Sequence, residues 1–287
     1  MNIAFIGVGV MGRGMVANLL NKGYQVGTYS RRKESAKSVL GLGAVWHDSI
    51  KSCVKDADVV ISMVGYPKDV EEVYFGNEGI LDSAKEGAIL IDMTTTSPKL
   101  AVRIENEARR RGLKALDAPV SGGDTGAQKG TLAIMAGGDE AAFNQCLPIF
   151  EAMGKTIVYQ GKAGSGQHTK MANQIAIAGC VAGVAEAITY GKAAGLDLNI
   201  LLDTISGGAA GSWQLSNNGR KMVEGDYAPG FYIKHFIKDM DIAKEEAQDR
   251  HLSLGILEKV LEKYQSLADA GLEDEGTQAI IKKYMTE

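Results

Sequence analysis

The sequence predicts an α/β protein with a doubly wound, mostly parallel sheet in its N-terminal half and an all-α C-terminal half, joined by a long helix. Short apolar runs alternate with helical segments up to about residue 160, which is typical of a parallel sheet. Beyond residue 195 no strand alternation returns. Residues 165–195 contain no proline and few charges, and they predict one helix about 45 Å long.

The glycine-dense segment 161–166 lies just before this helix and predicts the domain boundary. We therefore expect domains of residues 1–163 and 164–287, a division that suits a chain of 287 residues. The uncharged part of the long helix, residues 175–185, is shorter than the roughly 18 residues needed to span a bilayer. We expect a core helix between domains or subunits, and no membrane partner.

Charge and cysteine content exclude several classes of function. The formal net charge of −4 gives no electrostatic footprint for nucleic acid. The three cysteines are scattered without the spacing of a disulfide framework or a metal site, so we expect neither. Reduced thiols and the absence of a secretory pattern at the start of the chain favour a cytoplasmic protein.

The first strand, residues 2–6, runs directly into a glycine turn and a helix that continues through Leu20. A second strand, residues 25–29, follows at the distance that a βαβ unit requires. Such a turn lets a diphosphate approach the backbone at the helix N-terminus, although a glycine turn without a ligand is the alternative. The arrangement predicts a dinucleotide-binding Rossmann domain whose cofactor-binding residues include Gly7, Val8, Gly9, Val10, Met11 and Gly12.

The end of the second strand decides which dinucleotide is expected. An NAD-binding unit usually has an acidic residue there, whereas this chain has Ser30, Arg31 and Arg32. Arginine can pair with a 2′-phosphate, and the sequence places no carboxylate beside it to repel the phosphate. We expect NADP(H) rather than NAD(H), with a basic helix start that contacts no nucleotide as the alternative.

Ligands of parallel sheets lie outside the carboxyl ends of the strands. The strands expected at residues 58–64, 88–92, 114–117 and 131–136 therefore direct attention to the segments 63–65, 94–96 and 118–123. The last of these has a hydroxyl and exposed N–H groups, which suit a carboxylate, although a plain glycine-rich loop fits equally.

Lys170 lies near the start of the long helix, with Asn173 and Gln174 three and four residues further on, so one helix face carries an ammonium and an amide. The helix alone also fits a lysine that solvates its first turns. Likewise, Lys238 and Asp239 by themselves fit an ordinary pair at a helix surface.

Four motifs, taken together and in order, resemble the β-hydroxyacid dehydrogenase family, which includes 3-hydroxyisobutyrate dehydrogenase, tartronate semialdehyde reductase and the glyoxylate/succinic semialdehyde reductases. They are GVGVMG at residues 7–12, DAPVSGG at 117–123, GKAGSGQHTKMANQ at 161–174 and IKDMDIA at 237–243. The resemblance spans nearly the whole chain. It implies a Rossmann domain, a linking helix, a helical domain, and assembly into dimers or tetramers.

The resemblance also implies roles for individual residues. Lys170 would be catalytic, and Thr95 and Lys238 would contact the cofactor. Met63 and Val64, at the carboxyl end of an expected strand, are further expected cofactor contacts. The substrate carboxylate would be held by Ser121, Gly122, Gly123 and an amide of the long helix, with Thr95, Phe231 and Asp239 near the substrate. Many members have asparagine four residues after the lysine, where this chain has Gln174, so either Asn173 or Gln174 meets the substrate.

The function expected from these residues is an NADP(H)-preferring oxidoreductase that interconverts a short 3-hydroxyacid and its semialdehyde. Lys170 would act as general acid and base, which can accelerate such a step by about 10² to 10⁴. A glyoxylate/succinic semialdehyde reductase is the alternative of the same class. An imine reductase is disfavoured because those enzymes commonly replace the lysine, and a non-catalytic NADP-binding module remains the alternative of another class.

Overall fold

The computed structural model describes residues 1–285 and divides into two compact units, Met1–Lys170 and Met171–Glu287. The division falls inside the long helix α9 (Ser165–Ala193), whereas the sequence pattern places the boundary after residue 163. Residues 286–287 of the expected second domain lie outside the described residues.

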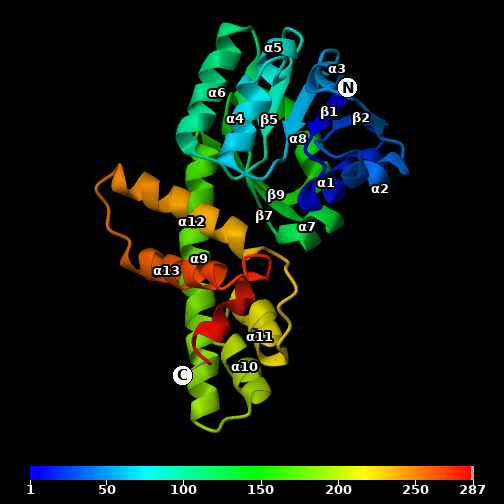
Figure 1. Ribbon diagram of the computed structural model, residues 1–287. Helices are drawn as coiled ribbons and strands as arrows, with labels where there is room; N and C mark the ends of the chain where they lie inside the picture. Colours follow the sequence, from blue (N-terminus) through cyan, green and yellow to red (C-terminus); the bar gives the residue numbers. More distant parts are fainter. Residues whose placement is uncertain (286–287) are drawn as a thin grey trace. The chain divides into compact units, whose positions relative to one another are not determined.

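Unit 1 is built on a nine-stranded sheet (Figure 1). Its first six strands are parallel and lie in the order β3-β2-β1-β4-β5-β6, the order of a dinucleotide-binding fold. β8 then pairs antiparallel with β6, and both β7 and β9 pair with β8. The strands are β1 (Asn2–Ile6), β2 (Gln25–Tyr29), β3 (Val45–Trp46), β4 (Val59–Ser62), β5 (Ile89–Asp92), β6 (Lys114–Asp117), β7 (Val120–Ser121), β8 (Leu132–Gly138) and β9 (Gly154–Gly161).

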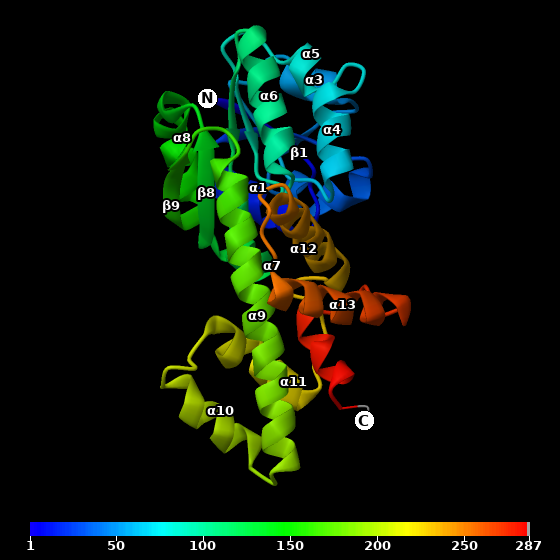
Figure 2. The ribbon, with the colours of Figure 1, turned by 90° about the vertical axis from the view of Figure 1, so that its left-hand side faces the viewer.

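Helices cover both faces of this sheet, so its central strands are apolar on both sides. In β1, Ile3 and Phe5 face one core, shared with α1 and α8, whereas Ala4 and Ile6 face the other, shared with α3, α4 and α6. Figure 2 shows α4 and α6 on one side of the sheet and α8 on the other. The helical segments of unit 1 are α1 (Val10–Asn21), η1 (Lys33–Ala36), α2 (Lys37–Leu40), α3 (Ile50–Val54), α4 (Pro67–Phe75), α5 (Ile80–Ser83), α6 (Pro98–Arg110), α7 (Gly123–Lys129) and α8 (Glu140–Met153).

Unit 2 is helical throughout its described part, apart from one isolated bridge between Tyr232 and Gly276. Its core surrounds Phe236 and Tyr264, whose rings meet edge to face at 5.2 Å. The elements after α9 are α10 (Leu198–Ser206), a π-helical turn η2 (Gln214–Gly219), α11 (Arg220–Glu224), α12 (Ile233–Gln248), α13 (Gly255–Asp269) and the 3₁₀ segment η3 (Thr277–Lys283). The expected fold class, a Rossmann domain followed by a helical half, is confirmed.

Within unit 2, α9 buries only one of its faces. Its buried side includes Ala178, Val181 and Ile188, whereas Ala172 and Gly183 are exposed on the opposite side. By length and composition alone α9 could cross a membrane. An 18-residue stretch of it has a mean hydropathy of 1.4 and at most two charged residues. Of this stretch, 44% is buried inside the protein. Core helices of soluble proteins have the same length and hydropathy, so these features are weak support for a membrane span.

Candidate active site

The glycine turn between β1 and α1 leaves room for a ligand at one glycine and none at the other two. A Cβ on Gly7 would lie 2.2 Å from the Met63 carbonyl oxygen, and one on Gly12 would lie 2.3 Å from the Gly7 oxygen. A Cβ on Gly9 would meet nothing within 4 Å. Gly9 is exposed and caps the N-terminus of α1, where oriented N–H groups attract phosphate. The turn therefore fits the diphosphate of a dinucleotide.

At the end of β2, Ser30 and Arg31 have different surroundings. The Ser30 hydroxyl accepts a hydrogen bond from the Val8 N–H at 2.6 Å and so holds the glycine turn. Arg31 is exposed, and its guanidinium lies 3.2 Å from the Asp69 carboxylate. The expectation that no carboxylate lies beside this arginine is wrong, because α4 brings Asp69 there from a distant part of the sequence. Arg32 is exposed and is the N-cap residue of η1.

The segments that follow β4 and β5 are joined by a hydrogen bond. The Val64 N–H donates to the Thr94 hydroxyl at 3.0 Å, which joins two of the expected ligand-binding segments. Met63 and Val64 are half-buried, as is Thr95, whose neighbours Thr94 and Thr96 are buried. Both segments thus lie at the carboxyl edge of the sheet next to the glycine turn.

The serine-glycine loop is formed by β7 and the start of α7. Ser121 is half-buried at the end of β7, and Gly122 is exposed. Gly122 and Gly123 have φ angles of 135° and 61°, which other residues rarely adopt. The sequence needs both glycines to turn the chain sharply from strand into helix while the serine stays accessible.

The start of α9 is anchored to the carboxyl end of β6. Asp117 accepts hydrogen bonds from the Gly164 N–H and the Gln167 N–H, both at 2.8 Å. Burial raises the pKa of Asp117 to about 6, although these backbone donors oppose the shift. Lys170 follows one turn later and is 6% exposed, so it does not lie in bulk water. An alkylammonium buried to this degree is expected to have a polar or charged partner.

Unit 2 has a polar cluster of its own, in which amide side chains of α9 meet a carboxylate of α12. Gln174 donates to Asp239 at 2.6 Å and accepts from the Asn173 amide at 2.8 Å. Lys238 forms an ion pair with Asp239 at 2.8 Å. Both the amide oxygen and the amide nitrogen of Gln174 are therefore hydrogen-bonded. Asn173 is half-buried, and its amide nitrogen donates to Gln174.

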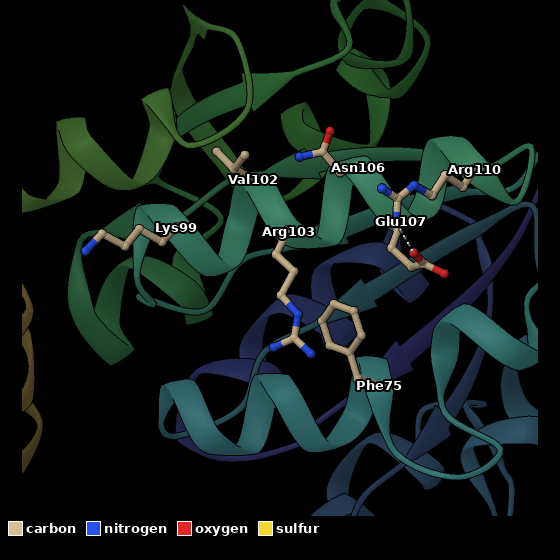
Figure 3. A pocket seen from close by; sticks show the side chains of 7 residues that line it. All are labelled: Phe75, Lys99, Val102, Arg103, Asn106, Glu107 and Arg110. Carbon is tan, nitrogen blue, oxygen red and sulfur yellow. Dashed lines mark hydrogen bonds and ion pairs between the residues drawn. The ribbon is translucent and has the colours of Figure 1, made fainter.

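Phe231 lies in unit 2, at the margin of its core, where its ring meets Phe236 edge to face at 5.7 Å. A surface groove of about 610 Å³ lies elsewhere, along the outer side of α6. Figure 3 shows its walls, including Arg103 turned toward Phe75 of α4. None of the expected site residues lines this groove.

Sequence reasoning missed several residues of this site. Gln167 donates to the Thr94 carbonyl and accepts from the Thr96 N–H, but it was one polar residue among many before Lys170. Its position three residues before Lys170, on the same helix face, was the available signal. The signal for Asp69 was clearer. A proline at the first position of a helix, followed two residues later by an acidic residue, is typical of a capped helix start, and Pro67 and Asp69 have this spacing.

Comparison with known proteins identifies the family. Residues 2–161 match the family described as the NAD binding domain of 6-phosphogluconate dehydrogenase. Residues 164–284 match the family described as NAD-binding of NADP-dependent 3-hydroxyisobutyrate dehydrogenase. The uncharacterized oxidoreductase YkwC of Bacillus subtilis is 56% identical over 283 residues, which cover 99% of this chain and 98% of YkwC.

Several of the similar proteins have named activities. The NAD-dependent L-serine dehydrogenase of Pseudomonas aeruginosa is 38% identical over 86% of this chain and 85% of its own. The structure of Mycobacterium tuberculosis 3-hydroxyisobutyrate dehydrogenase with L-serine superposes with a TM-score of 0.91 at 30% identity, covering 99% of each chain. The chain therefore belongs to the β-hydroxyacid dehydrogenase family and is a nicotinamide-dependent oxidoreductase.

Proposed function

We propose that this protein is an NADP(H)-preferring enzyme that interconverts a short 3-hydroxyacid and its semialdehyde, with Lys170 as general acid and base. The observation that carries the proposal is the placement of Lys170. It is buried, and it lies one turn after a helix start that is bonded to the Thr94–Thr96 segment of the dinucleotide-binding unit.

The residues of the chain divide the work of the reaction. Bound nicotinamide supplies the hydride chemistry at the carbinol or carbonyl carbon. In the reductive direction the Lys170 ammonium donates a hydrogen bond, and then its proton, to the carbonyl oxygen, and it stabilises the negative charge that develops there. In the oxidative direction the neutral amine takes the proton back.

The substrate carboxylate requires its own anchor, because a fixed carboxylate orients the reacting carbon. Ser121, Gly122 and Gly123 offer a hydroxyl and N–H groups at an exposed turn. Asn173 is the better amide for this role, because both ends of the Gln174 amide are already used within unit 2.

The cofactor preference rests on Arg31, whose exposed guanidinium is able to bind a 2′-phosphate. The NAD-dependent relative shows that this family also contains NAD enzymes. The preference for NADP(H) is therefore tested by itself, through the ratio of kcat/KM values for the two cofactors.

Lys170→Ala tests the catalytic role. We expect turnover of short semialdehydes to fall by a factor of about 10² or more, with NADPH binding nearly unchanged. Lys192→Ala is the matched control, because Lys192 is an exposed lysine in the last turn of the same helix. A Lys170→Ala enzyme as active as this control would contradict the proposal.

A substrate panel separates the remaining candidates of the same class. 3-Hydroxyisobutyrate, L-serine and other short hydroxyacids are oxidised, and glyoxylate and succinic semialdehyde are reduced, each with both cofactors. Preference for glyoxylate or succinic semialdehyde would favour the reductase alternative. NADPH binding without any turnover would favour a non-catalytic module.

We further propose a cytoplasmic protein that self-associates through its helical unit. The exposed face of α9 has small residues such as Gly183, beside which another helix could pack closely, and Tyr190, which is 75% exposed and adds apolar surface. Light scattering of the protein and of Gly183→Arg tests this, because a charged side chain on that face would break the assembly.

A further inference from the structure

Both carboxylate oxygens of Asp117 accept hydrogen bonds from the start of α9. Asp117 is 4% exposed, and its side chain accepts from the Gly164 and Gln167 N–H groups through different oxygens. These N–H groups lie at a helix start, where intrahelical partners are lacking and a carboxylate is favoured. The end of β6 therefore fixes both the position and the direction of this turn.

Gln167 joins the same turn to a second element. Its side chain is fully buried, its oxygen accepts from the Thr96 N–H at 3.0 Å, and its amide donates to the Thr94 carbonyl at 2.7 Å. The two bonds bracket Thr95. The start of α9 and the segment after β5 are thus connected on both sides of an expected cofactor contact.

Two glycines show that the backbone is closely packed where the start of α9 meets β6 and β8. A Cβ on Gly166 would lie 2.3 Å from the Met135 carbonyl oxygen and 2.6 Å from that of Asp117. A Cβ on Gly137 would lie 2.8 Å from the Gly166 nitrogen. Backbone packed this closely moves only if the surrounding strands move with it.

Lys170 lies three residues after Gln167, on the same side of the helix. We propose that Asp117 and Gln167 are positioning residues for catalysis, which act by holding the first turn of α9, and with it Lys170, against the Thr94–Thr96 segment. This inference rests on the proposed function, because it assumes that Lys170 transfers the proton.

The expected effect is large, since misplacing a catalytic group by about 1 Å can lower the rate by a factor of about 10². Asp117→Asn keeps the shape of the side chain but replaces one acceptor with a donor that faces an N–H group. Gln167→Met keeps the length and removes both bonds. Neither change is expected to alter the glycine turn or Arg31.

The experiment compares kcat, the KM of a semialdehyde substrate and the dissociation constant of NADPH in the full-length variants. We expect kcat to fall by a factor of about 10 to 100 in each, with a much smaller change in the NADPH dissociation constant. Asp139→Asn is the matched control. Asp139 caps α8 in the same unit by accepting from Ala142 at 2.7 Å, and we expect this variant to keep the wild-type kcat.

Each outcome has a defined meaning. Wild-type kcat in Gln167→Met would overturn the inference, and this variant decides the matter if Asp117→Asn does not fold. Weakened NADPH binding that accounts for the whole loss would also overturn it, because the two residues would then serve the nucleotide site. If the wild-type enzyme turns over no semialdehyde or hydroxyacid, the proposed function fails instead, which is a separate result.

Discussion

The guanidinium of Arg31 lies 3.2 Å from the carboxylate of Asp69, so the end of β2 is paired with the start of α4. Asp69 is buried and also accepts from the Tyr66 N–H at 3.0 Å, which fixes its position. Arg31 is 72% exposed, and a pair of this kind contributes only about 0 to 1 kcal/mol. A pair this weak leaves the guanidinium of Arg31 able to bind a phosphate instead.

This relationship predicts the effect of Arg31→Ala on cofactor choice. A hydrogen bond to a charged phosphate contributes about 1.5 to 3 kcal/mol, so we expect kcat/KM for NADPH to fall by a factor of about 10 to 100. The value for NADH should change little, because NADH has no 2′-phosphate. Steady-state kinetics with both cofactors measures the ratio. Arg109→Ala, which removes an exposed arginine of α6, is the control, and an unchanged ratio in Arg31→Ala would assign the preference elsewhere.

Gln174→Leu should destabilise the helical unit. Gln174 is 1% exposed and donates to Asp239, which is equally buried, so leucine leaves a buried carboxylate oxygen without this donor. The expected loss is about 1 to 3 kcal/mol in the free energy of unfolding. Thermal unfolding measures it against Gln248→Leu, the same substitution at an exposed position of α12. Equal melting temperatures for the two variants would mean that the Asp239 bond contributes no stability.

Features that depend on neighbouring residues were predictable from the sequence, whereas contacts between residues far apart in the sequence were not. The glycine turn and the alternation of strands and helices were predictable, because residues close together in the sequence carry both patterns. Gln167 is hydrogen-bonded to Thr96, which is 71 positions away in the sequence, and Asp69 is paired with Arg31, which is 38 positions away. No local pattern indicates these partners. The roles of Asn173 and Gln174 separate only once the Asp239 contact is known.

Gly166→Ala should lower both activity and stability. The added methyl group would lie 2.3 Å from a carbonyl oxygen of β8, a separation that backbone atoms cannot relieve without moving the strand. We expect a fall in melting temperature of several degrees and a lower kcat. Gly255→Ala is the control, because Gly255 begins α13 and an added Cβ there meets nothing within 4 Å. Equal behaviour of the two variants would mean that the α9 start tolerates displacement.

Asp92 gives unit 1 a dependence of stability on pH. Burial raises its pKa to about 7, the Asp117 charge adds to the shift, and bonds from Ser62 and Thr94 oppose it. The unfolded value is about 3.9, so between pH ~4 and ~7 the folded state holds more protons and its stability falls as the pH rises. Tyr74 lies beside Ser62, and its raised pKa keeps it neutral in this range.

Asp92→Asn removes this contribution while keeping an oxygen to accept from Ser62 and Thr94, which both donate to the same carboxylate oxygen. The melting temperature of the wild-type protein minus that of the variant should therefore decrease as the pH rises from about 4 to about 7, and level off above it. Thermal unfolding of both proteins across this range measures the difference, in which the titrations they share cancel. A difference that does not vary with pH would show that Asp92 does not change its protonation between the folded and unfolded states in this range.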